Sequence, residues 1–184
     1  MRSRTFIKRL RAVLAVGPLV ALSWAGAYAA FTDSVDATSS FSTGSVAIQA
    51  NDQSGSVAFT SLSTSGMRPG TVTYAPLKIS NSGSLDATYT MASATSGSAA
   101  LAAALTVGIK VVGASTCDAS AYAGSSTVAY AQAAGVGAAA IAARPLASGT
   151  SEYLCFRVEL PASADNTLQG LTTNATFTFT AAAS

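Results

Sequence analysis

The apolar residues of this chain follow two different patterns. Residues 12–22 form an uninterrupted apolar run. After residue 44, apolar and polar residues alternate in short stretches, which is the pattern of strands buried on one face. These stretches are 46–50, 57–59, 71–80, 87–91, 107–111, 153–160 and 172–181. Turn residues separate most of them and a short helical pattern lies at 99–105, so the second part of the chain predicts an all-β domain.

The two late stretches show the alternation most clearly. In 153–160 every second residue is apolar, and in 172–181 Phe177 and Phe179 alternate with threonines. Pro76 removes one hydrogen-bond donor from the stretch 71–80, which predicts an edge or a bulge there. About seven to nine such strands without a long helix predict a two-sheet antiparallel sandwich, either jelly-roll-like or immunoglobulin-like.

The first 29 residues have the organisation of a signal peptide. Basic residues precede the apolar run, and small residues at Ala27 and Ala29 flank Tyr28 in the A-x-A pattern that a signal peptidase accepts. We expect cleavage between Ala29 and Ala30, and a secreted protein that is extracellular or at the cell surface. A spanning helix needs about 20 apolar residues, so the run at 12–22 predicts no stable membrane span in the mature form.

Removal of residues 1–29 changes the charge of the protein. This segment holds five of the ten Lys and Arg residues and none of the eight Asp and Glu residues, so the mature chain has a net charge of −3. The basic pI of the precursor therefore gives no support for nucleic-acid binding. By length, residues 42–184 suit one sandwich domain, preceded by a separate N-terminal strand at 30–41.

The strand pattern fails between residues 113 and 149. Within this Ala/Gly-rich excursion, residues 130–143 are mostly alanine and predict a short helix or a low-complexity loop. Cys117 lies in the excursion and Cys155 in a predicted core strand, and the chain has two cysteines. Because an exported protein meets an oxidising environment, we expect a disulfide between them that contributes roughly 4 kcal/mol.

The absence of histidine limits the chemistry of this chain. It excludes Ser-His-Asp and Cys-His nucleophile systems and His-ligated zinc. Asp33 and Asp36 are close in sequence but point to opposite faces of a strand, and Glu152 and Glu159 are expected to be solvated charges. We therefore expect no enzyme activity, no catalytic residue, no metal site and no cofactor. A site built from carboxylates alone is the alternative that remains open.

Residues 30–41 are amphipathic when extended. Phe31, Val35, Ala37 and Phe41 share one face at strand spacing, and Asp33 and Ser39 interrupt that face. The segment becomes a free end only after signal cleavage, so it suits the addition of a strand to the sheet of a neighbouring subunit. A head-to-tail contact of this kind repeats without closing and gives a filament. The alternative is that the strand folds back onto its own sheet.

Three sets of motifs occur in order along the chain. The first is residues 29–34, Ala-Ala-Phe-Thr-Asp-Ser, with residues 41–46, Phe-Ser-Thr-Gly-Ser-Val. The second is the turn at 67–70, Met-Arg-Pro-Gly, with residues 77–85, Leu-Lys-Ile-Ser-Asn-Ser-Gly-Ser-Leu. The third is the closing turn Leu168-Gln169-Gly170 with the strand through Thr176-Phe177-Thr178-Phe179. Together these motifs resemble the TasA and camelysin family of bacterial biofilm-matrix proteins.

The resemblance implies a jelly-roll fold, processing by the dedicated signal peptidase SipW, and assembly into extracellular fibres by N-terminal strand donation. It implies a structural subunit of a surface or biofilm-matrix fibre, with other copies of the chain and a signal peptidase as partners. Camelysin members also carry a metallopeptidase label, which is the first alternative function. The second is a monomeric cell-surface binding module in which residues 113–149 make the contact.

Overall fold

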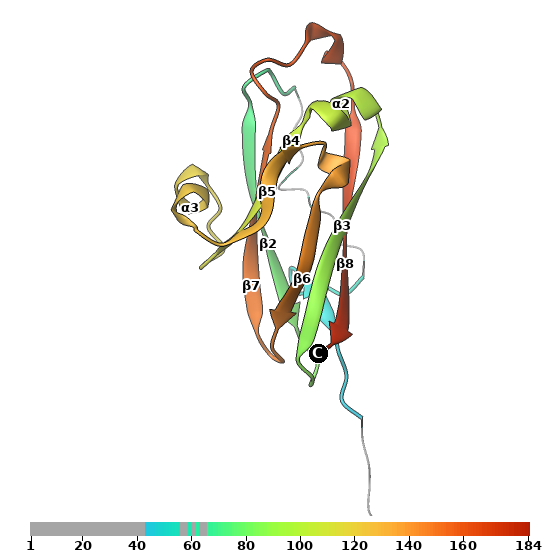
Figure 1. Ribbon diagram of the computed structural model, residues 1–184, viewed down its shortest axis with the longest axis vertical. Helices are drawn as coiled ribbons and strands as arrows, with labels where there is room; N and C mark the ends of the chain where they lie inside the picture. Colours follow the sequence, from blue (N-terminus) through green and yellow to red (C-terminus); the bar gives the residue numbers. More distant parts are fainter. Residues whose placement is uncertain (1–42, 56–58, 60–61, 63–65) are drawn as a thin grey trace, which may run out of the picture. The chain divides into compact units, whose positions relative to one another are not determined.

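The computed structural model describes residues 43–55, 59, 62 and 66–184. These residues contain eight strands in two antiparallel sheets (Figure 1). Side chains from both sheets meet in one hydrophobic core. The predicted all-β, two-sheet sandwich is therefore confirmed.

Five strands form sheet A, in the spatial order β1-β2-β7-β4-β5, and three form sheet B, in the order β6-β3-β8. Every neighbouring pair of strands is antiparallel. Except for β1–β2 and β4–β5, consecutive strands lie in different sheets, so most connections cross the sandwich. The bounds are β1 (Ile48–Ala50), β2 (Val72–Asn81), β3 (Ala87–Gly97), β4 (Thr106–Val112), β5 (Val128–Ala134), β6 (Ala140–Leu146), β7 (Ser151–Glu159) and β8 (Thr173–Ala183).

Short helices occupy some of the connections: α2 (Ala99–Ala104), α3 (Ala119–Gly124), and the 3-10 helices η2 (Val136–Ala138) and η3 (Asn166–Leu168). Ser98 caps α2, because its hydroxyl accepts a hydrogen bond from Leu101 N at 3.2 Å. The predicted helix at 99–105 is therefore confirmed. No helix in this described part of the chain is long and apolar enough to cross a membrane.

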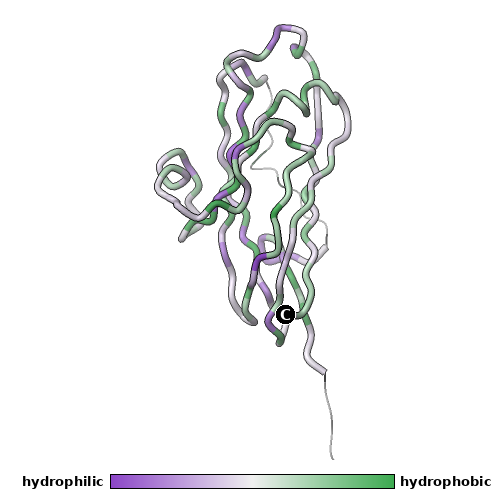
Figure 2. Tube along the Cα trace, viewed as in Figure 1, coloured by the Kyte–Doolittle hydropathy of each residue, from purple (hydrophilic) through white to green (hydrophobic). Residues whose placement is uncertain are grey.

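The core lies between the sheets. Phe156 of β7 and Tyr89 of β3 are fully buried, and Phe156 packs against Phe177 of β8 with ring centroids 4.9 Å apart. Strongly hydrophilic residues are more frequent along β2 and β7 than along β3 and β8 (Figure 2). The charged residues of the strands are thus concentrated on sheet A.

The excursion differs from its prediction. Residues 130–143, expected as a short helix or a loop, contain most of β5, the turn η2 and the first part of β6. β5 pairs with β4 and β6 pairs with β3, so both strands belong to the sandwich. Alanine has little preference for strands, and the pairing is instead supported by burial of Val136, Ala139 and Ile141.

Two further strand predictions concern the segment before β2 and β2 itself. Val57 lies outside the described residues, and Phe59 belongs to no strand, which corrects the prediction of a strand at 57–59. Pro76 lies in a part of β2 that pairs with β7 on one side, while β1 covers only the Ile79–Asn81 end on the other. The predicted edge at Pro76 is therefore confirmed.

Candidate functional site

β8 is an edge strand. It pairs with β3 over all eleven of its residues, from Ala87↔Ala183 to Gly97↔Thr173, without a bulge. Its second edge has no partner strand among the described residues. β8 contains no charged residue and no proline, the two devices that most often protect an open edge. The strand therefore presents a row of backbone donors and acceptors that another strand can use.

β2 presents a second open edge. Its neighbour β1 ends after three residues, because Asn51 and Asp52 adopt φ angles of 50° and 62° and turn the chain back. Asn51 closes the pairing: its backbone N–H donates to Lys78 O at 2.9 Å, and its side chain accepts from Lys78 N at 3.0 Å. Asp52 then forms an ion pair with Lys78 at 2.7 Å. Beyond this lock, the rest of β2 has a partner strand on one side only, within the part of the chain that is described.

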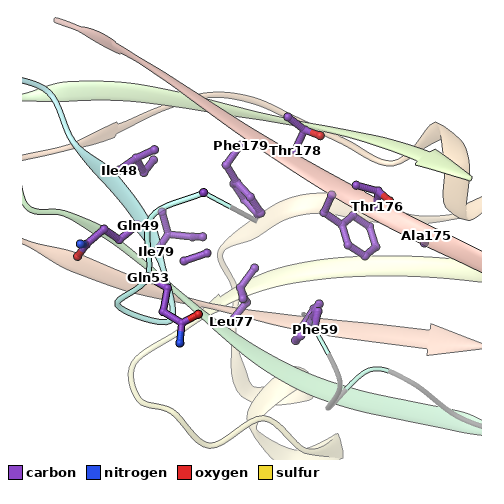
Figure 3. A pocket seen from close by; sticks show the side chains of 13 residues that line it. Ile48, Gln49, Gln53, Phe59, Leu77, Ile79, Ala175, Thr176, Thr178 and Phe179 are labelled. Carbon is purple, nitrogen blue, oxygen red and sulfur yellow. The ribbon is translucent and has the colours of Figure 1, made fainter. Parts of the chain in front are cut away.

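A groove lies between the open sides of β2 and β8. Its first hollow has a volume of about 510 Å³ and is lined by β1, by Leu77 and Ile79 of β2, and by Phe177 and Phe179 of β8. Figure 3 shows Leu77, Ile79 and Phe179 converging from the two sheets, with Gln49 and Gln53 toward the β1 side. The groove thus combines apolar side chains with polar side chains and backbone groups, and this combination suits the binding of an extended peptide segment.

Phe59 divides this groove from a second hollow of about 550 Å³. Its ring meets Phe156 at a centroid distance of 5.1 Å and Phe177 at 6.4 Å, both edge to face. The second hollow continues past the start of β8 toward α2, where Leu101, Leu105, Val158, Leu160 and Leu168 line it. Together the two hollows follow the open side of β8.

Most residues of the predicted assembly site lie outside the described residues. These are the signal-peptidase junction, Ala27, Ala29 and Ala30, and the donor strand, Phe31, Val35, Ala37 and Phe41. The described chain begins beside the groove: Gly44 lies against Leu85, and the backbone of Ser45 and Ala47 pairs with residues 82–85. Residues 45–50 run from there along the end of β2 and form one wall of the groove.

Cys117 and Cys155 are joined in a disulfide with their Cα atoms 5.3 Å apart, the pairing expected from the sequence. Cys155 is fully buried in β7, and Cys117 directly precedes Asp118, the N-cap of α3. On this outer face of sheet A, Tyr122 of α3 packs against Tyr74 of β2 at 5.9 Å, and Lys110 lies 4.9 Å from the Tyr122 ring. The disulfide therefore fastens α3 to the side of sheet A that faces away from the core.

The charged side chains inside the sandwich are already paired. Glu152 of β7 accepts hydrogen bonds from Arg144 of β6 and from the hydroxyl of Tyr89. Burial, and then the hydrogen bond to Glu152, raises the pKa of Tyr89, while the bond to Glu152 raises the pKa of Arg144. Near neutral pH this cluster therefore keeps fixed charges, which suits a structural role better than proton transfer.

These features define a class: an antiparallel β-sandwich with a groove between β2 and β8, two strands that have an unpaired edge within the described residues. The family model of camelysin metallo-endopeptidases matches residues 5–101, which is more than half of the chain. The chain belongs to this family, and its resemblance to TasA and camelysin is confirmed. No curated protein matches the chain. Strands β4 to β8 lie beyond the matched residues.

The family description names a metal-dependent peptidase, and the described residues do not fit a metal centre. No three of their His, Cys, Asp and Glu side chains lie together where they would share an ion. Three carboxylates, those of Asp52, Glu152 and Glu159, are held in ion pairs with Lys78, Arg144 and Arg157. Both cysteines are in the disulfide. No catalytic step through a metal is derived from this arrangement.

Sequence reasoning missed the groove itself. Alternation in 172–181 indicated a one-sided strand but not that its second edge would be open, because an edge is a property of sheet order. The conformation of Asn51 and Asp52, which ends β1, was missed as well. A usable signal was the Asn-Asp dipeptide, since these residues adopt left-handed conformations more readily than most.

Proposed function

We propose that the mature chain is a secreted structural subunit of an extracellular surface or biofilm-matrix fibre, and that residues 30–41 of one subunit insert as a strand into the groove of the next. The observation that supports this most is the bulge-free, uncharged second edge of β8, open along an apolar groove. Backbone hydrogen bonds to such an edge supply affinity, and apolar pockets set the register.

The length of the donor segment suits the acceptor strand. Twelve residues, Ala30 to Phe41, extend over about 40 Å, and the eleven residues of β8 over about 36 Å. Four apolar residues on one face of the donor would meet Phe177, Phe179 and Leu77 in the groove. The uncharged groove walls match that face, since they hold no unpaired charge that insertion would desolvate.

The family description favours a second candidate function, a secreted metal-dependent peptidase. No three potential metal ligands lie together among the described residues, and the chain has no histidine. We therefore propose a non-enzymatic role. Casein cleavage that is lost with a chelator, measured on protein from a peptidase-free host, would support the peptidase instead.

The test of fibre assembly compares the secreted protein with a version that starts at Ser42. Electron microscopy and sedimentation should show filaments for the first and single subunits for the second. Addition of a synthetic peptide with the sequence of residues 30–41 should cap the groove and slow assembly of the intact protein. Filaments from the truncated protein, or an intact protein that stays monomeric at high concentration, would contradict strand donation.

A further inference from the structure

The outer face of sheet B has an unusual composition. Its side chains come from the outward positions of three strands, which alternate with buried residues such as Tyr89 and Met91. All of them are small and uncharged: Thr88, Thr90, Ala92, Ala94 and Ser96 of β3, Asn174, Thr176, Thr178, Thr180 and Ala182 of β8, and Ala140, Ala142 and Pro145 of β6. All except the half-buried Thr88 are exposed.

No charged side chain lies on this outer face, although the strands of sheet A carry several. The one charged residue of β3, β6 and β8 is Arg144, and its guanidinium points into the sandwich, where it pairs with Glu152 at 2.8 Å. Sheet A, by contrast, carries Lys78, Lys110 and Arg157 outward of its core. A sheet face that only meets water usually carries lysine and glutamate, whereas a face that meets protein is depleted of them.

The register of β3 and β8 gives this face a relief. Ala94 and Ala92 of β3 stand opposite Thr176 and Thr178 of β8. The larger threonine side chains therefore form a ridge along β8, and the smaller alanine side chains leave a depression beside it on β3. A second copy related to the first by a two-fold rotation would place its threonines over the alanines of the first copy. By symmetry, the threonines of the first copy would lie over the alanines of the second. Small side chains that interdigitate in this way let two sheets approach to about 10 Å.

We propose that the outer face of sheet B is a self-association surface that binds the same face of a second copy of this chain. Removing this face from water costs little, because it carries no charge and its hydroxyls can bond to each other or to their own strands.

The size of the face limits the strength of the contact. Two strands about 36 Å long and one about 24 Å long, spaced about 4.8 Å apart, cover roughly 460 Å² per copy, or about 900 Å² for a pair. That is the lower end of specific interfaces, so isolated subunits associate weakly. Between two neighbouring filaments of the proposed kind, the same contact would repeat at every subunit. The repeated contacts would bind strongly by avidity and would bundle the filaments side by side.

The experiment measures covalent capture of copies by a short bis-maleimide, which does not react with the native disulfide. The variant Thr180→Cys places one thiol on the face, and Thr127→Cys places one at an exposed position between α3 and β5. We expect Thr180→Cys to form dimers about tenfold faster than Thr127→Cys at equal concentration. Because the face is uncharged, this rate should be nearly the same at low and high salt.

A second substitution tests the chemistry of the contact. Thr178→Lys in the Thr180→Cys background should reduce the capture rate to that of Thr127→Cys, because like charges would meet across the two-fold axis. Thr127→Lys in the same background is the matched control and should leave the rate unchanged. Thr176→Lys serves as an independent version of the first change, and circular dichroism checks that each variant is folded.

Equal capture rates for Thr180→Cys and Thr127→Cys, or a fast rate that survives both lysine substitutions, would overturn the proposal and leave the face for a different partner. The outcome is separate from that of strand donation, since capture is counted between any two copies. A protein that is captured through residue 180 but forms no filament would contradict the proposed fibre and support this surface.

Discussion

Tyr89 of β3 donates a hydrogen bond to the carboxylate of Glu152 in β7, so a polar contact joins the two sheets inside the sandwich. Arg144 of β6 completes the cluster with two hydrogen bonds to the same carboxylate, from Nε at 3.1 Å and from Nη2 at 2.8 Å. Since Tyr89 is fully buried, its hydroxyl depends on this partner. Both sheets are therefore held in one relative position by a paired, satisfied network.

The first prediction concerns the dependence of stability on alkaline pH. Burial and the bond to Glu152 raise the pKa of Tyr89 above its ordinary value of 10. Since the folded state holds the proton more tightly than the unfolded state, the contribution of Tyr89 is complete below pH 10 and is lost as the pH rises further. Denaturant titrations between pH 8 and 11 should show this fall.

Tyr89→Phe is the matched variant for this prediction. At neutral pH it should cost about 1–3 kcal/mol, because Glu152 loses a buried donor. Its free energy of unfolding should then fall less steeply above pH 10 than that of the wild type. Equal slopes in the two proteins would show that Tyr89 does not couple its proton to folding.

The second prediction concerns the disulfide. Reduction, or the double change Cys117→Ser with Cys155→Ser, should lower the free energy of unfolding by roughly 4 kcal/mol, because the bond closes a loop across a sequence separation of 38 residues. Hydrogen exchange should increase in α3, which the disulfide fastens to β7, while β3 and β8 stay protected. Uniform loss of protection over both sheets would contradict a local role.

The third prediction concerns Asn81 at the end of β2, which is 1% exposed. Its side-chain nitrogen donates to Leu85 O at 2.8 Å and to Leu146 O at 3.1 Å, and its oxygen accepts from Gly83 N at 3.0 Å. Asn81→Asp would place a carboxylate against two carbonyl oxygens and should cost several kcal/mol. Asn81→Ala should cost about 2–3 kcal/mol, since three hydrogen bonds are lost but no charge is buried.

Ser82→Ala is the control for this position, because its hydroxyl makes one exposed hydrogen bond, to Ala47 O at 3.3 Å. Its midpoint in a thermal melt should stay within a few degrees of the wild type. If Asn81→Asp and Ser82→Ala unfold at the same temperature, the buried hydrogen bonds of Asn81 contribute little to the stability of the fold.

The turn at 81–85 also explains how far the sequence leads to the structure. Turn residues follow the strand pattern of 71–80 directly, and they have separate physical roles: Asn81 donates to the carbonyls of Leu85 and Leu146, and a Cβ on Gly83 would collide with the carbonyl of Ser45. The side-chain period of 2 likewise predicted which residues of β7 face the core. These are local or periodic properties, and the sequence carries them directly.

Sheet order and pairing partners are different, because they depend on contacts between distant segments. The alanine-rich β5 and β6 have no strong strand preference of their own and form by pairing with β4 and β3. β8 has an open side because no described strand follows it in sheet B, and most of β2 has one because β1 stops at Asn51. Residue periodicity contains neither fact, which is why the strand donor was predicted from the sequence while its acceptor was not.

The fourth prediction tests the acceptor with a single residue. Ala175 of β8 is exposed and lines both hollows of the groove, so Ala175→Lys would place a charge where the apolar face of a donated strand has to lie. The change should leave the fold intact, since Ala175 is not part of the buried core, and should raise the concentration needed for filament formation about tenfold or more. Sedimentation and electron microscopy of the secreted protein measure both states.

Ala131→Lys is the matched control, because Ala131 is an exposed alanine of β5 in the other sheet. It should assemble like the wild type. In a mixture, Ala175→Lys subunits keep a normal donor segment but a blocked groove, so a small fraction of them should end growing filaments and shorten them. Normal filament lengths in such mixtures, with Ala175→Lys subunits incorporated throughout, would show that the donated strand binds elsewhere than along β8.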